Sequence, residues 1–317
     1  KVDGEFQWSS GESVTYTNWD QIEAQPDGDG NFVQMYLLSG TWNDHYGMQL
    51  NYVLEIKTGC THPNASNYDD SANADDGSCE FETVQIGHQL WMTENLKATH
   101  YRNGDAINYT DYDNDSSNSE VYGRLYSWNI VDDDRGVCPV GWHVPSDVEH
   151  KELEMFLGMS EAEANNIGFR GTNEGSKLAG NVELWQPGAL VNNYEFGISG
   201  FNAIPGGYFE GNDNVFMYKS TRSYFWLSSE SGGNPDYWEL REGDANIARG
   251  TNNNVHGFSI RCLSDETLNT TINVPENFAT IQEAIDYSID GDTILVSSGI
   301  YYENINFNGK NIALIGE

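Results

Sequence analysis

The chain has 317 residues, enough for two or three domains, and carries 49 acidic against 15 basic side chains, a formal net charge of −34 at pH 7. This charge repels nucleic-acid phosphates and the anionic face of a membrane, so we expect neither as a partner. The apolar runs are shorter than the roughly 18 residues that a spanning helix needs, which predicts no membrane insertion in this segment. Abundant carboxylates suit a calcium-rich extracellular surface, although a merely soluble acidic surface explains the charge equally well.

The cysteines and the two ends bear on where the chain works. Cys60, Cys79, Cys138 and Cys262 form no CxxC pair and have no histidine at zinc spacing, so disulfides in an oxidising compartment are the economical interpretation. The chain begins and ends inside strand-like patterns, and no signal peptide opens it. We therefore expect a segment of a longer secreted protein whose signal peptide and anchor lie outside it.

Residues 1–57 hold a series of short motifs rich in tryptophan, amide and carboxylate side chains. In order these are Trp8, Ser13–Tyr16, Asn18–Trp19, Gln25–Asp27, Asn31–Met35, Gly40–Asp44 and Tyr52–Glu55. Their order resembles the C-terminal half of a C-type lectin domain. In that family the Gln-Pro-Asp loop and the Trp-Asn-Asp strand hold one Ca²⁺, whose open positions bind two sugar hydroxyls. The resemblance implies one set of calcium and carbohydrate ligands: Gln25, Asp27, Asn43 and Asp44.

This segment departs from the lectin pattern in two ways. A further acidic ligand of the family falls on Gly30 or Asn31 here, and the family's cysteines are missing, so packing must hold the long loop. In the alternative interpretation, Trp42 is a packing residue, and Asn43 and Asp44 cap a turn. If the site is intact, Gln-Pro-Asp resembles the galactose-preferring members of the family.

Residues 58–81 are rich in turn residues and have almost nothing to bury. A Cys60–Cys79 disulfide would close a loop of about 20 residues and remove on the order of 3 kcal/mol of unfolded-state freedom. The segment resembles a short cysteine-bounded motif of multi-domain surface proteins of Bacteroidota. Its acidic residues could seat Ca²⁺, and a plain spacer of Asx turns is the alternative. The calcium ligands would be Asp69, Asp75 and Asp76.

Residues 82–264 carry a second ordered series of motifs. These are Thr83–Gly87, Trp91–Leu96, Tyr122–Trp128, Cys138–Ser146, Ala203–Tyr208 and Gly257–Cys262. The series resembles the Fibrobacter succinogenes major paralogous domain. A cysteine beside a Gly-Trp turn and a second cysteine that ends an alternating strand also predict one long-range disulfide, Cys138–Cys262.

Capping boxes predict two helices in this domain. Ser146 and Glu149 open a helix that ends at Gly158, and Ser160 and Glu163 open another that ends at Gly168. The residues expected to face inward from the first helix are Val148, Leu153, Phe156 and Leu157. Elsewhere short strands and long loops indicate an α+β fold. The closing strand resembles that of formylglycine-generating and C-type-lectin-like domains, which implies their topology.

We expect no catalytic residue in this chain. Its histidines are isolated in sequence, its serines lie in no Gly-x-Ser-x-Gly turn, and its cysteines are expected to pair with each other. A group of aromatic residues fits two interpretations, a hydrophobic core or a platform that stacks on the apolar face of a sugar. The group comprises Tyr208, Phe209, Tyr218, Tyr224, Phe225, Trp226, Tyr237 and Trp238.

Residues 265–317 alternate short apolar strands with Gly and Asn. A capping box at Thr280 and Glu283 predicts a helix with Ile281, Ala284, Ile285 and Ile289 on one stripe. The stretch resembles the N-terminal cap and first coil of right-handed pectin-lyase-like β-helices. No arginine follows Arg261, so lyase or hydrolase activity is not located in this segment.

The expected fold class is α+β and multi-domain, with C-type-lectin-like domains followed by the cap and first coil of a right-handed parallel β-helix. We expect part of a large secreted surface adhesin or extracellular structural protein. Calcium-dependent contact with glycans or other cell-surface components is the expected binding activity. The alternative is an accessory region of an extracellular polysaccharide-degrading enzyme whose catalytic β-helix lies beyond residue 317.

Overall fold

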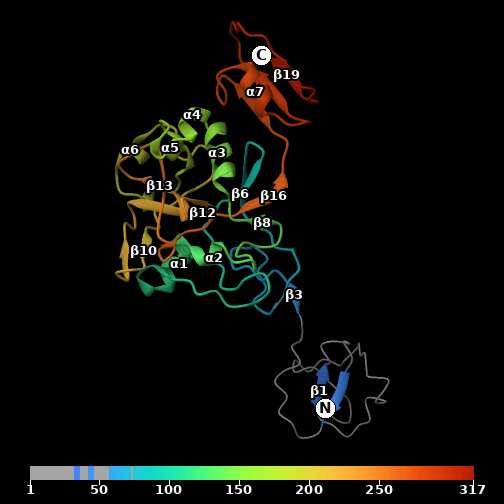
Figure 1. Ribbon diagram of the computed structural model, residues 1–317, viewed down its shortest axis with the longest axis vertical. Coiled ribbons are helices and arrows are strands. Elements are labelled where there is room, and N and C mark those ends of the chain that lie inside the picture. The colour runs from blue at the N-terminus through green and yellow to red at the C-terminus, as the bar shows by residue number, and fades with distance from the viewer. Residues whose placement is uncertain (1–31, 36–41, 46–56, 73) are drawn as a thin grey trace. The chain divides into compact units, whose positions relative to one another are not determined.

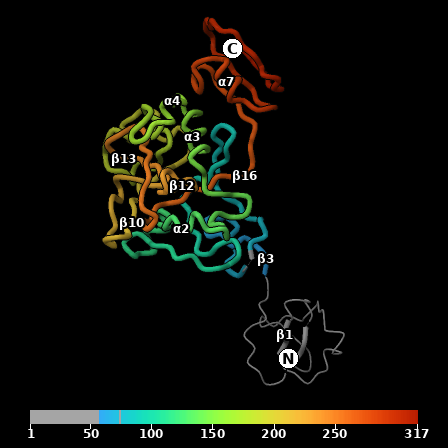
Figure 2. The backbone as a smooth tube through the Cα atoms, in the orientation of Figure 1, coloured from blue at the N-terminus to red at the C-terminus, as the bar shows by residue number. Residues whose placement is uncertain are grey.

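The computed structural model describes residues 32–35, 42–45, 57–72 and 74–317, and it divides into the units Lys1–Lys57 and Thr58–Glu317 (Figures 1 and 2). In the first unit, strands β1 (Phe32–Met35) and β2 (Trp42–His45) pair antiparallel. This hairpin is compatible with many folds. The lectin-like assignment of residues 1–57 therefore stays a prediction.

The second unit begins with the predicted acidic linker. Strands β3 (Thr58–Gly59) and β4 (Ala74–Asp75) form a short parallel pair, and the predicted Cys60–Cys79 disulfide is present. Asn64 anchors the linker to the next domain, because its Nδ2 donates to the carbonyl of Asn95 at 3.0 Å and its Oδ1 accepts from the Lys97 amide at 2.7 Å. The linker is thus stabilised by contacts at its border as well as by its disulfide.

Three four-stranded antiparallel sheets build the central domain. The first has the order β5 (Thr83–Ile86), β6 (Gln89–Met92), β16 (Leu263–Thr267) and β8 (Trp142–His143). The second has the order β11 (Val215–Met217), β10 (Tyr208–Glu210), β15 (Gly257–Phe258) and β7 (Tyr126–Ser127). The third has the order β12 (Arg222–Ser231), β13 (Asn234–Arg241), β14 (Ile247–Thr251) and β9 (Gly168–Arg170). Because β6 pairs with β16 and β7 with β15, the beginning and the end of the domain lie side by side.

Short helices connect these strands. They are α1 (Ser116–Tyr122), α2 (Trp128–Val131), α3 (Asp147–Phe156), α4 (Glu161–Ala164), α5 (Glu174–Leu178) and α6 (Ala189–Asn192), with single turns η1 (Tyr112–Asn114) and η2 (Val182–Leu184). Both predicted capping boxes are confirmed. The prediction that Val148 faces inward is wrong: it is 64% exposed, while Leu153 is buried. Five residues advance a helix by about 140°, so these two side chains cannot share a face.

The long-range disulfide Cys138–Cys262 is also confirmed, with a Cα–Cα distance of 6.0 Å across a sequence separation of 124. Both cysteines are buried in a core cluster with Leu96 and Tyr126. A larger cluster, which includes Trp91, lies against the third sheet. The disulfide therefore fastens the last strands of the domain to its middle.

A small parallel sheet follows, with the order β17 (Thr271–Val274), β18 (Thr293–Val296) and β19 (Ala313–Gly316). Helix α7 (Ile281–Tyr287) begins at the predicted capping box and buries Ala284 and Ile285 against the sheet. Within the second unit this sheet contacts the central domain through His88, whose Nε2 lies 2.7 Å from Oδ2 of Asp292. The mixed α+β class is confirmed, and a complete β-helix coil stays a prediction.

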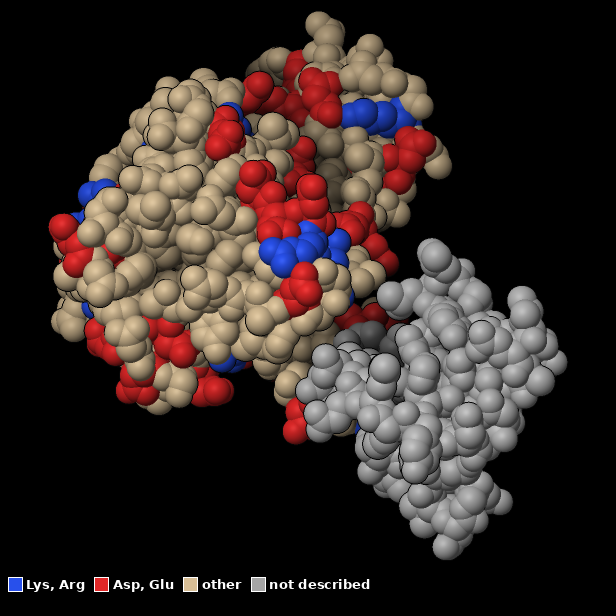
Figure 3. Space-filling model, turned by 60° about the horizontal axis from the view of Figure 1, so that its bottom comes forward, with Lys and Arg blue, Asp and Glu red and all other residues tan. Residues whose placement is uncertain are grey.

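The surface of the second unit reflects its composition. In Figure 3 acidic side chains form several groups with few basic side chains among them, and broad neutral areas lie between. None of the helices in the described part of the chain has the length and apolarity to cross a bilayer.

Candidate functional site

The β12–β13 hairpin has one face in the core and another that opens to solvent at one end. Strand alternation sends Phe225 into the main core cluster. On the opposite face Arg222 pairs with Arg241, and Tyr224 pairs with Glu239. The β10 strand of the second sheet lies near this hairpin in Figure 1. The open end therefore combines side chains from two sheets.

We name this solvent-reaching group the tyrosine face. It comprises Phe169, Tyr208, Tyr218, Arg222, Tyr224, Tyr237 and Arg241. The ring centre of Tyr208 lies 4.9 Å from that of Tyr224 and 5.9 Å from that of Tyr218. The ring centres of Tyr224 and Tyr237 are also 5.9 Å apart. The four tyrosine rings thus form one continuous cluster, in which Tyr224 is 5% exposed and Tyr218 is 38% exposed.

Tyr218 occupies an unusual backbone conformation at the edge of this face. Its φ is +65°, in the left-handed region that residues with a side chain rarely adopt. The Tyr218 carbonyl accepts hydrogen bonds from the amides of Thr221 (3.1 Å) and Arg222 (3.0 Å), which fixes the turn. This conformation leaves the side chain of Tyr218 38% exposed.

Arg222 lies between two of the tyrosines. The carbon of its guanidinium group is 3.9 Å from the centre of the Tyr218 ring. Its Nη1 donates to the hydroxyl of Tyr224 at 3.1 Å. The stacking and the hydrogen bond together hold the guanidinium plane in one orientation.

Arg241 is positioned by a buried carboxylate. Oε1 of Glu239 accepts hydrogen bonds from Nε of Arg241 at 3.0 Å and from its Nη2. The guanidinium carbon lies 4.5 Å from the ring centre of Phe169, which is 44% exposed. Glu239 is only 1% exposed, and its Oε2 has no hydrogen-bond partner. Its charge is therefore balanced mainly by Arg241.

The hydroxyls of Tyr208, Tyr224 and Tyr237 stay protonated at neutral pH. Burial raises the pKa of Tyr208 and of Tyr237. Burial and then the negative charge of Glu239 raise the pKa of Tyr224 well above its ordinary value. Neutral hydroxyls both donate and accept hydrogen bonds, and the rings offer apolar faces. Such a surface is suited to binding.

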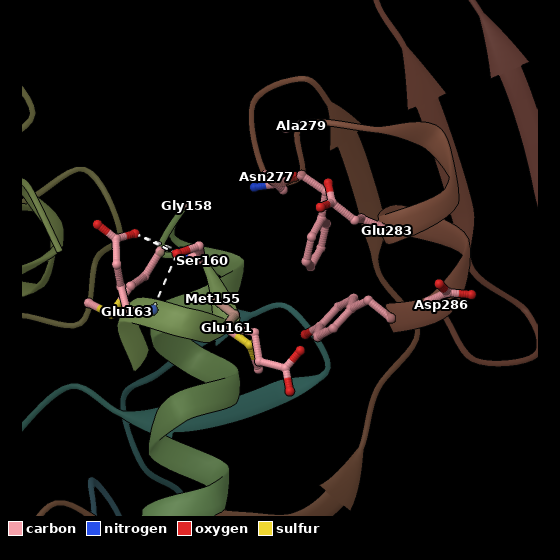
Figure 4. A pocket seen from close by; sticks show the side chains of 12 residues that line it. Met155, Gly158, Ser160, Glu161, Glu163, Asn277, Ala279, Glu283 and Asp286 are labelled. Atoms are coloured by element: carbon pink, nitrogen blue, oxygen red, sulfur yellow. Dashed lines mark hydrogen bonds between the residues drawn. The ribbon is translucent and has the colours of Figure 1, made fainter. Parts of the chain in front are cut away.

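A cavity of about 420 Å³ lies between the α3–α4 turn and the segment that leads into α7 (Figure 4). Met155, Met159 and Phe278 contribute apolar wall. The carboxylates that line it are Glu161, Glu163, Glu283 and Asp286. Glu163 and Glu283 are occupied in the capping boxes of α4 and α7, the former drawn in Figure 4. At least these two carboxylates stabilise helix starts.

The predicted lectin-like ligands fall largely beyond what the structure describes. Gln25 and Asp27 lie outside the described residues. Asn43 and Asp44 lie on β2, opposite Gln34 and Val33. The calcium and carbohydrate site therefore stays a prediction.

The predicted ligands of the linker make local turns. Asp69 accepts from the Ser71 amide at 2.9 Å, Asp75 from the Gly77 amide at 3.1 Å and Asp76 from the Ser78 amide at 3.0 Å. The hydrogen bonds with Ser78 lower the pKa of Asp76. Within the described ranges, no three His, Cys, Asp or Glu side chains are grouped to hold a metal ion. The Asx turns fit the spacer interpretation, and calcium binding in the linker stays a prediction.

The aromatic group divides between the two interpretations. Phe225, Trp226 and Trp238 are 0–1% exposed and belong to the core. Tyr218 and parts of Tyr208 reach the surface. Sequence reasoning missed the two arginines of the tyrosine face, Arg222 and Arg241, and the carboxylate of Glu239, which positions Arg241. Alternation was the available indication, because Tyr224 follows Arg222 by two residues in β12 and Arg241 follows Glu239 by two residues in β13, and alternate strand residues share a face.

The fold and the site define a disulfide-closed α+β domain that presents aromatic and arginine side chains on an open sheet face. A family model described as the Fibrobacter succinogenes major domain matches residues 84–264. The chain belongs to this family, and the predicted resemblance over residues 82–264 is confirmed. Among curated proteins and among solved structures, no match to the chain is found.

Proposed function

We propose that this chain is a segment of a secreted bacterial surface protein that works in adhesion or extended extracellular structure and not as an enzyme. The observation that carries the proposal is the pairing of all four cysteines in two disulfides. Disulfides persist in oxidising compartments and are rare in the cytosol. Because Cys138–Cys262 is buried in the central domain, the fold is suited to such a compartment.

The proposal includes a parallel β-helix that begins near residue 265. Its support is the parallel register in which Thr271 pairs with Thr293 and Thr293 with Ala313. The chain thus returns to the same register after roughly 20 residues, as solenoid repeats do. A lectin-like, calcium-binding N-terminal region is also part of the proposal, supported by the order of its motifs alone.

Labelling of intact source cells tests the proposal. An antibody against the chain and a membrane-impermeant thiol reagent are applied before and after cell lysis. We expect the antibody to bind intact cells and the cysteines to react only after reduction. Detection of the chain only after lysis, with four reactive thiols, would overturn the proposal.

A further inference from the structure

We infer that the tyrosine face is a binding site for a neutral glycan. This inference rests on the proposed function, because adhesion needs a recognition surface, and it names the site and the ligand class. The face offers apolar rings beside fixed hydrogen-bond donors. Sugar rings require this combination, since each has an apolar C–H face and a rim of hydroxyls.

The aromatic part of the site is accessible at its two ends. Tyr218 is 38% exposed and Phe169 is 44% exposed. Arg222 covers part of the Tyr218 ring and Arg241 part of the Phe169 ring. A sugar can therefore stack on the exposed ring area while the neighbouring guanidinium reaches its hydroxyls.

The backbone at Tyr218 supports a role beyond packing. Glycine or asparagine adopts a φ of +65° more readily than tyrosine does. A residue with a large ring incurs a backbone free-energy penalty at this φ, and the exposed part of the ring contributes little hydrophobic stabilisation in return. Binding accounts for a tyrosine here, because strained residues gather at ligand-contacting sites.

The polar part of the site is provided by the two arginines. Within the described part of the chain, Arg222 has no carboxylate at ion-pair distance, although acidic residues greatly outnumber basic ones. Nη1 of Arg222 donates to the Tyr224 hydroxyl, and among the residues that the structure describes its other guanidinium N–H groups have no acceptor. A planar guanidinium can donate two parallel hydrogen bonds to neighbouring oxygens. Glu239 is a positioning residue in this site, because it orients Arg241.

The charge of the chain selects a neutral ligand. A net charge of −34 repels polyanions, including acidic polysaccharides. Arg241 is paired with Glu239, and burial keeps Tyr208, Tyr224 and Tyr237 uncharged at neutral pH. Arg222 contributes one positive charge, and its guanidinium donates to the neutral Tyr224 hydroxyl. A neutral hexose or pentose polymer meets both conditions.

The test measures the affinity of the full chain for three soluble neutral polysaccharides: a β-glucan, a mannan and an arabinoxylan. Affinity electrophoresis and calorimetry give the dissociation constants. Polygalacturonate is the acidic polysaccharide for comparison. The deciding variant is Tyr218→Gly, which removes the ring and relieves the left-handed backbone. We expect about tenfold weaker binding with a melting temperature equal to or above that of the wild type. A purely structural role for Tyr218 predicts a lower melting temperature instead.

Two further variants sharpen the result. Tyr194→Gly is the matched control, because Tyr194 is an 88% exposed tyrosine of the same domain outside the face, and it should bind as the wild type does. Arg222→Lys keeps the charge and removes the planar fork, and it should weaken binding. If Tyr218→Gly binds glycan with the same affinity as the wild type, the assignment of the site is overturned and the proposed function still stands. Retention of the chain on a gelatin surface but on no polysaccharide overturns the glycan assignment.

Discussion

Arg261 is the buried charge that organises the centre of the domain. It is 1% exposed, and its guanidinium donates to the carbonyls of Met92, Phe201 and Asn202 and to Oδ1 of Asn95. Burial lowers the pKa of Arg261 to about 9. Replacement by methionine leaves these acceptors buried without a donor. We expect Arg261→Met to lower the free energy of unfolding by about 3 kcal/mol or more, measured by urea denaturation with the disulfides intact.

The matched control is Arg135→Met. Arg135 forms ion pairs with Asp105 and Asp133, and its side chain is 40% exposed. Solvent-exposed pairs contribute about 0–1 kcal/mol, so this variant should unfold nearly as the wild type does. Equal stability of the two variants would show that Arg261 does not organise the core.

His143 makes the stability of the domain depend on pH. Its Nδ1 lies 2.6 Å from Oδ1 of Asp265, and its Nε2 lies 2.9 Å from Oε1 of Glu149. The hydrogen bond with Glu149 raises the pKa of His143, and the same bond lowers the pKa of Glu149 to about 2. The His143 contribution is complete below about pH 6.5 and is lost as the pH rises through the raised value. The Glu149 contribution is complete above about pH 4.5 and is lost as the pH falls toward its lowered value.

The stability difference between the wild type and His143→Gln should therefore be largest between about pH 4.5 and 6.5. Urea denaturation of both proteins from pH 3 to 9 measures it. Glu149→Gln replaces the carboxylate with an amide whose oxygen can still accept from the Ser146 backbone in the capping box, and it should remove the loss on the acid side. A difference that does not change with pH would show that the His143 contacts do not form in solution.

At the residue scale, the sequence predicted both disulfides but could not separate core aromatics from surface aromatics. Arg222, Tyr224 and Trp226 share one face of β12, but only Tyr224 and Trp226 are buried, with Phe258 packed on them at 5.0 and 4.1 Å between ring centres. Those contacts come from another sheet. Alternation within β12 indicates which residues share a face, but it cannot show which end of the face is covered.

At the element scale, the two disulfides should differ in what they stabilise. Cys138–Cys262 closes a loop across a sequence separation of 124, and removing it should cost about 4–5 kcal/mol. Cys60–Cys79 spans a separation of 19 within the linker, so its loss should mainly speed proteolysis within residues 58–81. Paired cysteine-to-alanine variants, followed by denaturation and limited proteolysis, measure both effects. If the two paired cysteine-to-alanine variants lower the global free energy of unfolding equally, the linker is part of the cooperative core.

Helices were more predictable than strands. The helices α3, α4 and α7 each begin at a capping box, which is a local pattern of four residues. Helix α4 ends at Ala164 with Asn165 as its C-cap, before the predicted end at Gly168, and that glycine is instead the first residue of β9. Strands such as β7 and β15 have two residues each and exist only because a distant segment pairs with them. Their register is a tertiary property that a local pattern does not contain.

At the scale of the whole molecule, the proposed lectin-like region predicts a response to calcium. Extracellular calcium modules bind with dissociation constants of about 10⁻⁴–10⁻³ M. Calcium at 10 mM should then stabilise the folded region by roughly 1.4–2.7 kcal/mol, seen as a higher melting temperature than in chelator. Magnesium at the same concentration is the control, and Asp27→Asn with Asp44→Asn should remove the response. Coinciding melting curves in calcium and in chelator would contradict the prediction.

We propose that this chain recognises glycans at the cell surface and performs no chemistry on them. One incubation tests it most directly: the full chain is mixed with insoluble neutral polysaccharides, and both the bound protein and the released reducing ends are measured. We expect the chain to sediment with at least one polysaccharide, Tyr218→Gly to reduce the bound fraction, and no reducing ends to appear. Release of reducing ends, or failure of the wild type to sediment with any polysaccharide, would contradict this proposal.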